Sequence, residues 1–390
     1  MVKINEKKLN IKNIFQRFKG LFSIGISDIL GGGISSLFWL YVATLLSVED
    51  YGKIFYFLAI GNIATSISLV GSKDTLMVYV PKNVKLASTI FLLSIILGSI
   101  ISLIIFFFYS NSILGLYILG AVIFGLGASE ILAKKLYSNN FAFLIIQKLT
   151  MVGLSIGLYY LIGMDGIILG IGLSFFPYLL IVIKEFKTTK IDFSLLKPRL
   201  GFMLNSLGQN LLATFFNQID KLIVAPLLGF TLLANYQLGI QFVAAFQLLP
   251  LLVLKFTLPH DSTGNPNRNL KIVTVLISIC FTLLILFLAP IVISIFFPKF
   301  IYVVDIIQIL SISLIPLSIN SVYASKFLGA ENSRTIFIAM VLLFLTYISG
   351  IFILGNTFGI IGVAISYVLA MTTQTIFYFI SDLRKAISKH

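Results

Sequence analysis

Apolar runs of about 20 residues follow one another along almost the whole chain, and each is long enough for an α-helix to cross the hydrocarbon core of a bilayer. This succession restricts the fold more than any other feature, because only helices and closed barrels satisfy their backbone groups in lipid. We therefore predict an all-α integral membrane protein with twelve transmembrane helices. The predicted spans are 21–46, 54–72, 87–109, 112–133, 141–162, 165–183, 200–229, 232–254, 271–296, 301–328, 335–354 and 358–380.

The composition excludes several other classes of protein. Charged residues make up 11% of the chain, whereas they are about a quarter of a soluble domain. The net charge of +14 lies in short basic segments between the apolar runs, so we expect no nucleic-acid partner. With one cysteine, Cys280, and two distant histidines, His260 and His390, we predict no disulfide framework, no metal site and no cofactor.

Lysine and arginine are distributed unequally between the two sides of the predicted membrane. With the N-terminus inside, 24 of the 28 basic residues fall on the inner side, two (Lys53 and Lys299) fall on the outer side, and two (Lys148 and Lys221) lie within spans. This is the pattern of the positive-inside rule. It predicts a multi-pass protein of the cytoplasmic (inner) membrane with both termini in the cytoplasm.

The predicted organisation has five parts. The first 20 residues are basic and amphipathic, with no signal-peptide cleavage pattern, which favours a helix along the inner membrane surface. The parts are a cytoplasmic N-terminal segment (1–20), an N-lobe of six spans (21–183), a basic cytoplasmic linker (184–199), a C-lobe of six spans (200–380) and a cytoplasmic tail (381–390).

Short sequences recur in the two predicted lobes. The clearest is Gly166-Ile167-Ile168, followed by Gly170 and Ser174, which recurs as Gly359-Ile360-Ile361, followed by Gly362 and Ser366. Because six spans per lobe is an even number, duplicated lobes would have the same orientation and be related by a pseudo-two-fold axis along the membrane normal. A substrate site is then expected where the lobes meet. The alternative is chance similarity among helices rich in Gly, Ile and Leu.

Polar residues form one stripe along the seventh predicted span. A charge facing lipid at the centre of a helix costs roughly 2.5–3.5 kcal/mol, so the stripe must face protein or water. We favour a water-filled cavity over a packing seam because the stripe is long. Its polar members are Ser206, Gln209, Asn210, Thr214, Asn217, Asp220 and Lys221.

Two further ionisable residues lie inside other spans. Asp28, in the first span, lies among glycines, so tight helix packing and a functional role both explain it. Lys148 lies near the start of the fifth span. Its side chain either extends to the cytoplasmic surface or faces a cavity.

Gln237 and Gln241 of the eighth span and Asn320 of the tenth are expected to face the same interior. Glu130 lies four residues before Lys134, a spacing that favours an ion pair at a helix end.

Four short segments carry a resemblance to a known family. They are Leu45-Leu46-Ser47-Val48-Glu49-Asp50-Tyr51-Gly52, Asn217-Gln218-Ile219-Asp220-Lys221, Asn235-Tyr236 and Gly359-Ile360-Ile361-Gly362-Val363-Ala364. Together they resemble the polysaccharide-transporter branch (Wzx-type flippases) of the multidrug/oligosaccharidyl-lipid/polysaccharide (MOP) exporter superfamily. The resemblance implies two six-helix lobes around a central cavity that alternates between inward- and outward-open states. It implies a flippase for a polyprenyl-pyrophosphate-linked oligosaccharide, not an enzyme.

The resemblance also suggests roles for the polar residues. A buried pyrophosphate needs compensating charge, so Lys221 is the first candidate for the head-group contact and Lys148 the second. Asp220 or Asp28 would bind a coupling H+ or Na+. The remaining candidates for the substrate cavity are Asn217, Asn210, Gln209, Gln237, Gln241 and Asn320. The expected partners are the lipid-linked oligosaccharide and membrane lipids, with the protein acting as a monomer.

Three other functions stay open at this point. A multidrug or small-solute exporter of the same superfamily would share the fold and pair cationic substrates with Asp28 and Asp220. A membrane enzyme of glycan assembly, such as a polymerase or ligase, is disfavoured because the outer connections are short and contain no histidine. A passive scramblase or a structural protein would need no ion gradient.

Overall fold

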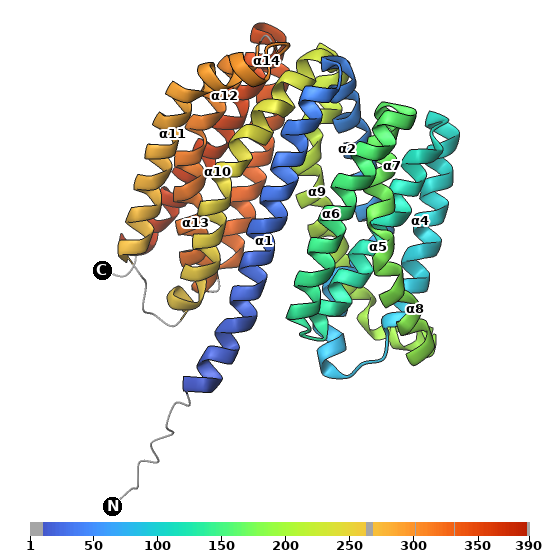
Figure 1. Ribbon diagram of the computed structural model, residues 1–390. Helices are drawn as coiled ribbons and strands as arrows, with labels where there is room; N and C mark the ends of the chain where they lie inside the picture. The colour runs from blue at the N-terminus through green and yellow to red at the C-terminus, as the bar shows by residue number, and fades with distance from the viewer. Residues whose placement is uncertain (1–10, 263–267, 301, 331, 388–390) are drawn as a thin grey trace, which may run out of the picture. The chain divides into compact units, whose positions relative to one another are not determined.

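The computed structural model describes residues 11–262, 268–300, 302–330 and 332–387, and within these ranges every regular element is a helix (Figure 1). Nine of the described helices are long and apolar enough to cross a membrane. Large apolar side chains on them are exposed, including Phe107 (80%), Phe108 (81%) and Phe287 (76%). Such a surface suits contact with lipid rather than water. The prediction of an all-helical multi-pass membrane protein is confirmed.

Five helices follow single predicted spans closely: α4 and α5 coincide with the spans predicted at 87–109 and 112–133, and α6, α9 and α11 begin and end within four residues of theirs. The α-helices are α1 (Ile11–Leu45), α2 (Val48–Leu69), α3 (Ser72–Tyr79), α4 (Ala87–Tyr109), α5 (Ser112–Ala133), α6 (Tyr137–Ile162), α7 (Met164–Ser174), α8 (Leu179–Thr188), α9 (Leu200–Leu228), α10 (Phe230–Ser262), α11 (Arg268–Phe296), α12 (Val303–Ile312), α13 (Leu314–Gly329) and α14 (Ser333–Ile387). Four short 3-10 turns complete the structure: η1 (Val80–Lys82), η2 (Phe176–Tyr178), η3 (Phe193–Leu195) and η4 (Lys197–Arg199).

Proline breaks two of the predicted spans into shorter helices. Pro177 lies in η2, between α7 and α8, and Pro316 lies just after the break at Ser313 that separates α12 from α13. A proline has no N–H group to donate and its ring crowds the preceding turn, so the regular α-helix is interrupted near it.

Helix α14 contains the last two predicted spans and folds back on itself at Gly359. The backbone there has φ 59° and ψ −138°, a conformation that glycine adopts readily because it has no Cβ atom. The two arms touch, since a Cβ added at Gly350 would lie 2.7 Å from Ser366 Cβ. The α14 segment is therefore a helical hairpin.

The turn between α6 and α7 has the same local structure. Gly163 has φ 68° and ψ −144°, close to the values of Gly359. In both hairpins the glycine three residues later packs against the preceding arm. A Cβ at Gly166 would lie 2.3 Å from the Leu158 carbonyl oxygen, and one at Gly362 would lie 1.9 Å from the Leu354 carbonyl oxygen.

This likeness corrects the register of the predicted repeat. The sequence comparison pairs Gly166 with Gly359, but the backbone pairs Gly163 with Gly359 and Gly166 with Gly362. The recurring element is thus Gly-x-x-Gly at a helical turn. The alignment based on the sequence Gly-Ile-Ile was therefore shifted by three residues.

The chain divides into two compact units, each with its own packing. Unit 1 contains Met1–Ile34 and Ala64–Leu211, and unit 2 contains Ser35–Ile63 and Leu212–His390. Helices α1, α2 and α9 each contribute residues to both units. The division into lobes at 21–183 and 200–380 stays a prediction. So does the amphipathic character of 1–20, whose side chains lie outside the described part of the chain.

Unit 1 has an apolar core between α4, α5 and α8, with fully buried Ile90, Phe91 and Val122. The α4–α5 connection is as short as the sequence predicts, and Asn111 begins α5 by accepting a hydrogen bond from the Leu114 N–H at 3.0 Å. The segment predicted as a linker is packed against this unit. The Asp192 N–H donates to Thr89 Oγ1 at 2.8 Å.

Unit 2 is built around α10, which packs against α12 and α13, with α11 and α14 completing the bundle (Figure 1). A cluster of aromatic rings closes one part of its core. Tyr51 packs edge-on against Phe55 and Phe300, with ring centroids 5.0 and 5.7 Å apart. Lys299 donates to the carbonyl oxygens of Thr44 (2.8 Å) and Leu46, so its ammonium stabilises the last turn of α1.

Candidate functional site

The charged residues of α9 form a buried ion pair in unit 2. Lys221 Nζ lies 3.0 Å from Asp220 Oδ1, and both side chains are largely buried, with exposed fractions of 12% and 8%. The ammonium also donates to the Asn217 carbonyl oxygen at 2.7 Å. These contacts of Lys221 all lie within its own helix, so this pair is satisfied locally.

The other oxygen of Asp220 faces α10. Gln237, which is buried, donates from Nε2 to Asp220 Oδ2 at 3.4 Å. The structure thus brings together three of the predicted site residues, Asp220, Lys221 and Gln237. Gln241, one turn further along α10, is half-buried.

Tyrosines complete this polar cluster, and sequence reasoning assigned no role to them. The hydroxyls of Tyr236 on α10 and Tyr347 on α14 lie 2.7 Å apart in a hydrogen bond. The Asp220 carboxylate interacts electrostatically with both phenols and with that of Tyr367. In the sequence, tyrosines within apolar runs could have indicated a polar cluster. They are a weak indicator, because a tyrosine ring also packs well in a core without any polar role. We call Asp220, Lys221, Gln237, Tyr236 and Tyr347 the α9 cluster.

The earlier part of the polar stripe belongs to unit 1. Asn210 donates from Nδ2 to Asp74 Oδ2 of α3 at 2.8 Å. Gln209 is exposed. Asn217, beyond the division between the units, is also exposed and donates to the Ala213 carbonyl oxygen at 2.8 Å. The stripe is thus not one continuous cluster within either unit.

Asn320 lies in a separate network between α13 and α14. Its Nδ2 donates to the Met371 carbonyl oxygen (3.1 Å) and to Gln374 Oε1 (2.9 Å), while Thr375 donates to its Oδ1 at 2.8 Å. Both ends of the amide are therefore engaged in joining two helices. A contact with substrate at Asn320 stays a prediction.

Lys148 is half-buried on α6 and packs against α1. A Cβ at Gly31 would lie 3.8 Å from Lys148 Cε. Asp28, one turn before Gly31 on α1, has its side chain outside the described part of the chain. Its predicted role in ion binding stays a prediction.

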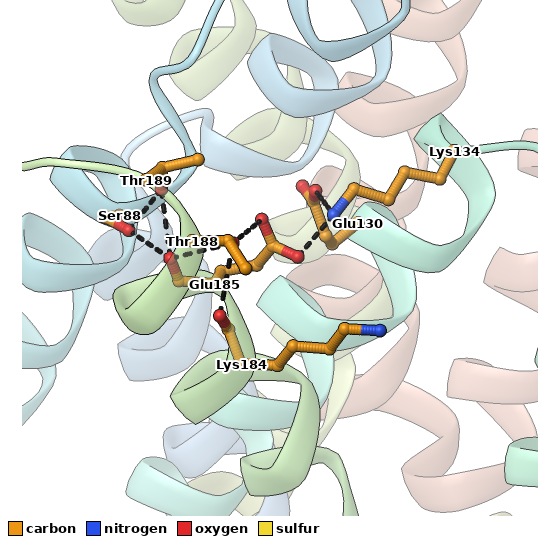
Figure 2. A network of polar contacts seen from close by, with 7 residues as sticks. All are labelled: Ser88, Glu130, Lys134, Lys184, Glu185, Thr188 and Thr189. Atoms are coloured by element: carbon orange, nitrogen blue, oxygen red, sulfur yellow. Dashed lines mark hydrogen bonds and ion pairs between the residues drawn. The ribbon is translucent and has the colours of Figure 1, made fainter.

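A second buried ion cluster lies in unit 1, where α5 meets α8 (Figure 2). Lys134 Nζ lies 3.0 Å from Glu130 Oε1, which confirms the predicted helix-end ion pair. The same ammonium donates to Glu185 Oε1 of α8. Burial lowers the pKa of Lys134, but the hydrogen bonds to Glu185 and Glu130 outweigh it, so the pKa is raised overall. We call Glu130, Lys134 and Glu185 the α5–α8 cluster.

Hydroxyl groups fix the Glu185 backbone beside this cluster. Ser88, at the start of α4, donates to the Glu185 carbonyl oxygen at 2.9 Å, and Thr189 donates to it at 3.1 Å. The two hydroxyl oxygens also lie within hydrogen-bond distance of each other, so their two hydrogens are shared among these three contacts (Figure 2). Sequence reasoning missed Glu185, because nothing local links it to a residue 51 positions earlier.

Among the described residues, no three His, Cys, Asp or Glu side chains lie close enough together to hold a metal ion. What the two clusters offer is buried ionisable groups on membrane helices, which in membrane proteins mark ion or substrate pathways. Such groups in a multi-pass helical bundle are typical of membrane transporters.

Comparison with known proteins makes that class specific. The chain is similar to the lipid II flippase MurJ in an inward closed conformation, with 16% identity, a TM-score of 0.73, and coverage of 93% of this chain and 87% of that one. It is also similar to an inward-facing multidrug resistance MATE family transporter (15% identity, TM-score 0.64, coverage 93% and 96%). A third match is a MOP superfamily transporter from Pyrococcus furiosus (14% identity, TM-score 0.62, coverage 95% and 96%). At these identities the likeness shows the shared fold.

A family model described as polysaccharide biosynthesis protein matches residues 41–262, which is more than half of the chain. The chain belongs to this family. The chain thus combines membership of a polysaccharide-biosynthesis family with the fold of these transporters. No curated protein sequence matches the chain significantly.

Proposed function

We propose that this protein is a flippase that moves a polyprenyl-(pyro)phosphate-linked oligosaccharide across the cytoplasmic membrane by alternating access, for assembly of a surface polysaccharide. The observation that carries the proposal is the polysaccharide-biosynthesis family match on a chain with the MOP transporter fold. The likeness to a lipid II flippase supports a lipid-linked substrate over a free sugar.

The proposed architecture has twelve spans in two six-helix lobes related by a pseudo-two-fold axis along the membrane normal. Nine described helices meet the length and hydropathy requirements, and one of them is the hairpin α14, which supplies two spans. Helices α1 (35 residues) and α10 (33 residues) are long enough to cross as well. The matching turns at Gly163 and Gly359 support duplication, and both termini are proposed to be cytoplasmic.

In the proposed site, Lys221 contacts the anionic head group, with Lys148 as the second candidate. Lys221 is paired with Asp220 in this structure, so a pyrophosphate must compete with that carboxylate for the ammonium. Because these partners of Lys221 lie on α9, the exchange needs no movement of another helix. Asp220, or Asp28, is proposed to bind the coupling H+ or Na+.

The test is translocation of a labelled polyprenyl-pyrophosphate oligosaccharide between the leaflets of liposomes containing the full-length protein. We compare wild type with Lys221→Ala, and use Lys53→Ala as the control, because Lys53 also pairs with a carboxylate (Glu49, 2.8 Å) but on an exposed surface. We expect wild type and Lys53→Ala to translocate the lipid, and Lys221→Ala to lose at least tenfold in rate. A loss of tenfold corresponds to about 1.4 kcal/mol.

Equal translocation by all three proteins would keep the flippase and reject Lys221 as the head-group contact. No translocation by any folded protein would reject the flippase for this lipid class. The exporter of cationic compounds would then lead, since Asp220 lies among the phenols of Tyr236, Tyr347 and Tyr367, which suits a cation. Saturable binding of a cationic dye that Asp220→Asn abolishes would support that second function.

A further inference from the structure

The α5–α8 cluster holds two buried carboxylates and a single ammonium. Glu130 and Glu185 are 1% and 3% exposed, and oxygens from both contact Lys134 Nζ. If both glutamates were ionised, the cluster would carry an uncompensated negative charge. Like charges that share one site disfavour each other's ionisation, and burial adds to that effect.

The two glutamates differ in how well their oxygens are satisfied. Glu185 accepts a hydrogen bond from Lys134 at Oε1, and Thr188 Oγ1 lies 3.5 Å from its Oε2. Glu130 Oε1 has one polar contact, with Lys134 Nζ at 3.0 Å, and within the described part of the chain Oε2 has no hydrogen-bond partner. An ionised carboxylate in this position is costly, whereas a neutral carboxylic acid is far less so.

Other charged groups near α5 do not restore the balance. In the part of the chain that the structure describes, the charged groups that act on Glu130 are Lys134 and Glu185. Lys73 of α3 contacts α5 at Gly125, more than one turn from Glu130. Lys184 of α8 contributes its backbone carbonyl, which accepts from Thr188 at 3.1 Å, and Figure 2 draws no contact between its ammonium and either glutamate.

We propose that Glu130, Lys134 and Glu185 form a proton-binding site in which one proton resides on Glu130 and brings the net charge of the cluster to zero. The proton comes from water on the side where Lys134 is exposed (37% of its side chain), the side predicted to be cytoplasmic. Lys134 already fills the position of a cation, which favours a proton over a metal ion as the ligand. The site depends on neither the substrate nor the direction of transport.

The first test is infrared spectroscopy of the full-length protein in lipid nanodiscs at neutral pH. A buried protonated carboxyl group gives a C=O stretching band distinct from that of a carboxylate. We expect wild type to show this band and Glu130→Gln to lose the component that belongs to Glu130, which a difference spectrum separates from any contribution of Asp220 or Asp28. The matched control is Glu49→Gln, the same change at an exposed glutamate, which should keep it. Retention of the band in Glu130→Gln with its loss in Glu185→Gln would overturn the assignment to Glu130.

Thermal unfolding at a series of pH values gives a second readout. An unfolded glutamate has a pKa of about 4.3, so near neutral pH the folded protein would hold one more proton than the unfolded chain. Stability therefore falls as the pH rises, because the folded state binds more protons. We expect Glu130→Gln to melt no lower than wild type at pH 7 and to lose part of this pH dependence, unlike Glu49→Gln. A melting temperature lowered by Glu130→Gln, with no acid band in wild type, would show that Glu130 is ionised and overturn the proposal.

Discussion

The α5–α8 cluster and the α9 cluster both contain buried charges, but the lysine of the first joins two helices whereas the lysine of the second pairs within its own helix. Lys134 follows the last turn of α5 and reaches across to Glu185 of α8, so it joins two helices. Lys221 contacts Asp220 and the Asn217 carbonyl oxygen, both on its own helix. A bridge between helices contributes to tertiary stability. A pair within one helix can open without moving its neighbours, which suits the proposed exchange of Asp220 for a substrate head group at Lys221.

The largest expected effect is the loss of the interhelical lysine. Lys134→Met removes the cation from two buried carboxylates and with it the ionic bridge between α5 and α8. We expect it to destabilise the protein by about 3 kcal/mol, the low end for breaking a buried ion pair, because part of the Lys134 side chain is exposed. Lys221→Met leaves one buried carboxylate without its cation instead of two, and Asp220 keeps its contact with Gln237, so we expect a smaller loss of about 2 kcal/mol. Thermal unfolding in one detergent gives both values, and equal losses would contradict the comparison.

The second-largest difference in stability between the two clusters is expected when a carboxylate is changed to an amide. Asp220→Asn leaves Lys221 without its counter-ion, and we expect a loss of about 1–2 kcal/mol. Glu130→Gln, the same chemical change in the α5–α8 cluster, should cost nothing at neutral pH if its carboxyl is already protonated. Asp220→Asn should also bind a polyprenyl pyrophosphate more tightly, because the competing carboxylate is gone. Weaker binding would show that Asp220 assists the head group instead of competing with it.

Much of the fold can be predicted from the sequence because the length of an apolar run is a physical requirement of the bilayer. The bounds of α4 and α5 follow from it directly. The Glu130–Lys134 pair could also be predicted, because four residues along a helix place two side chains together. Glu185 could not, because only the packing of α8 against α5 brings it to Lys134.

The repeat shows the same limit in another form. Matching letters aligned Gly166 with Gly359, but a turn is defined by backbone dihedral angles, and the glycine with a positive φ in the first hairpin is Gly163. The polar stripe of α9 shares a helical face, yet Asn210 is held by Asp74 of α3 in unit 1 while Asp220 is held by Gln237 of α10 in unit 2. Helical periodicity predicts which side chains share a face, but not which neighbouring helix meets each of them.

The smallest expected effects concern the hydroxyl groups at the edge of each cluster. Tyr347→Phe removes one partner of a short, fully buried hydrogen bond and leaves the Tyr236 hydroxyl without it, so we expect a loss of about 1 kcal/mol. Thr188→Val removes a hydroxyl that lies 3.5 Å from Glu185 Oε2 and otherwise bonds to carbonyls of its own helix. At that distance the hydrogen bond is weak, so the change should stay within about 0.5 kcal/mol. Both variants can be measured by the same unfolding experiment. A larger loss in Thr188→Val than in Tyr347→Phe would mean that the second oxygen of Glu185 depends on Thr188, and that the α5–α8 cluster is not held by Lys134 alone.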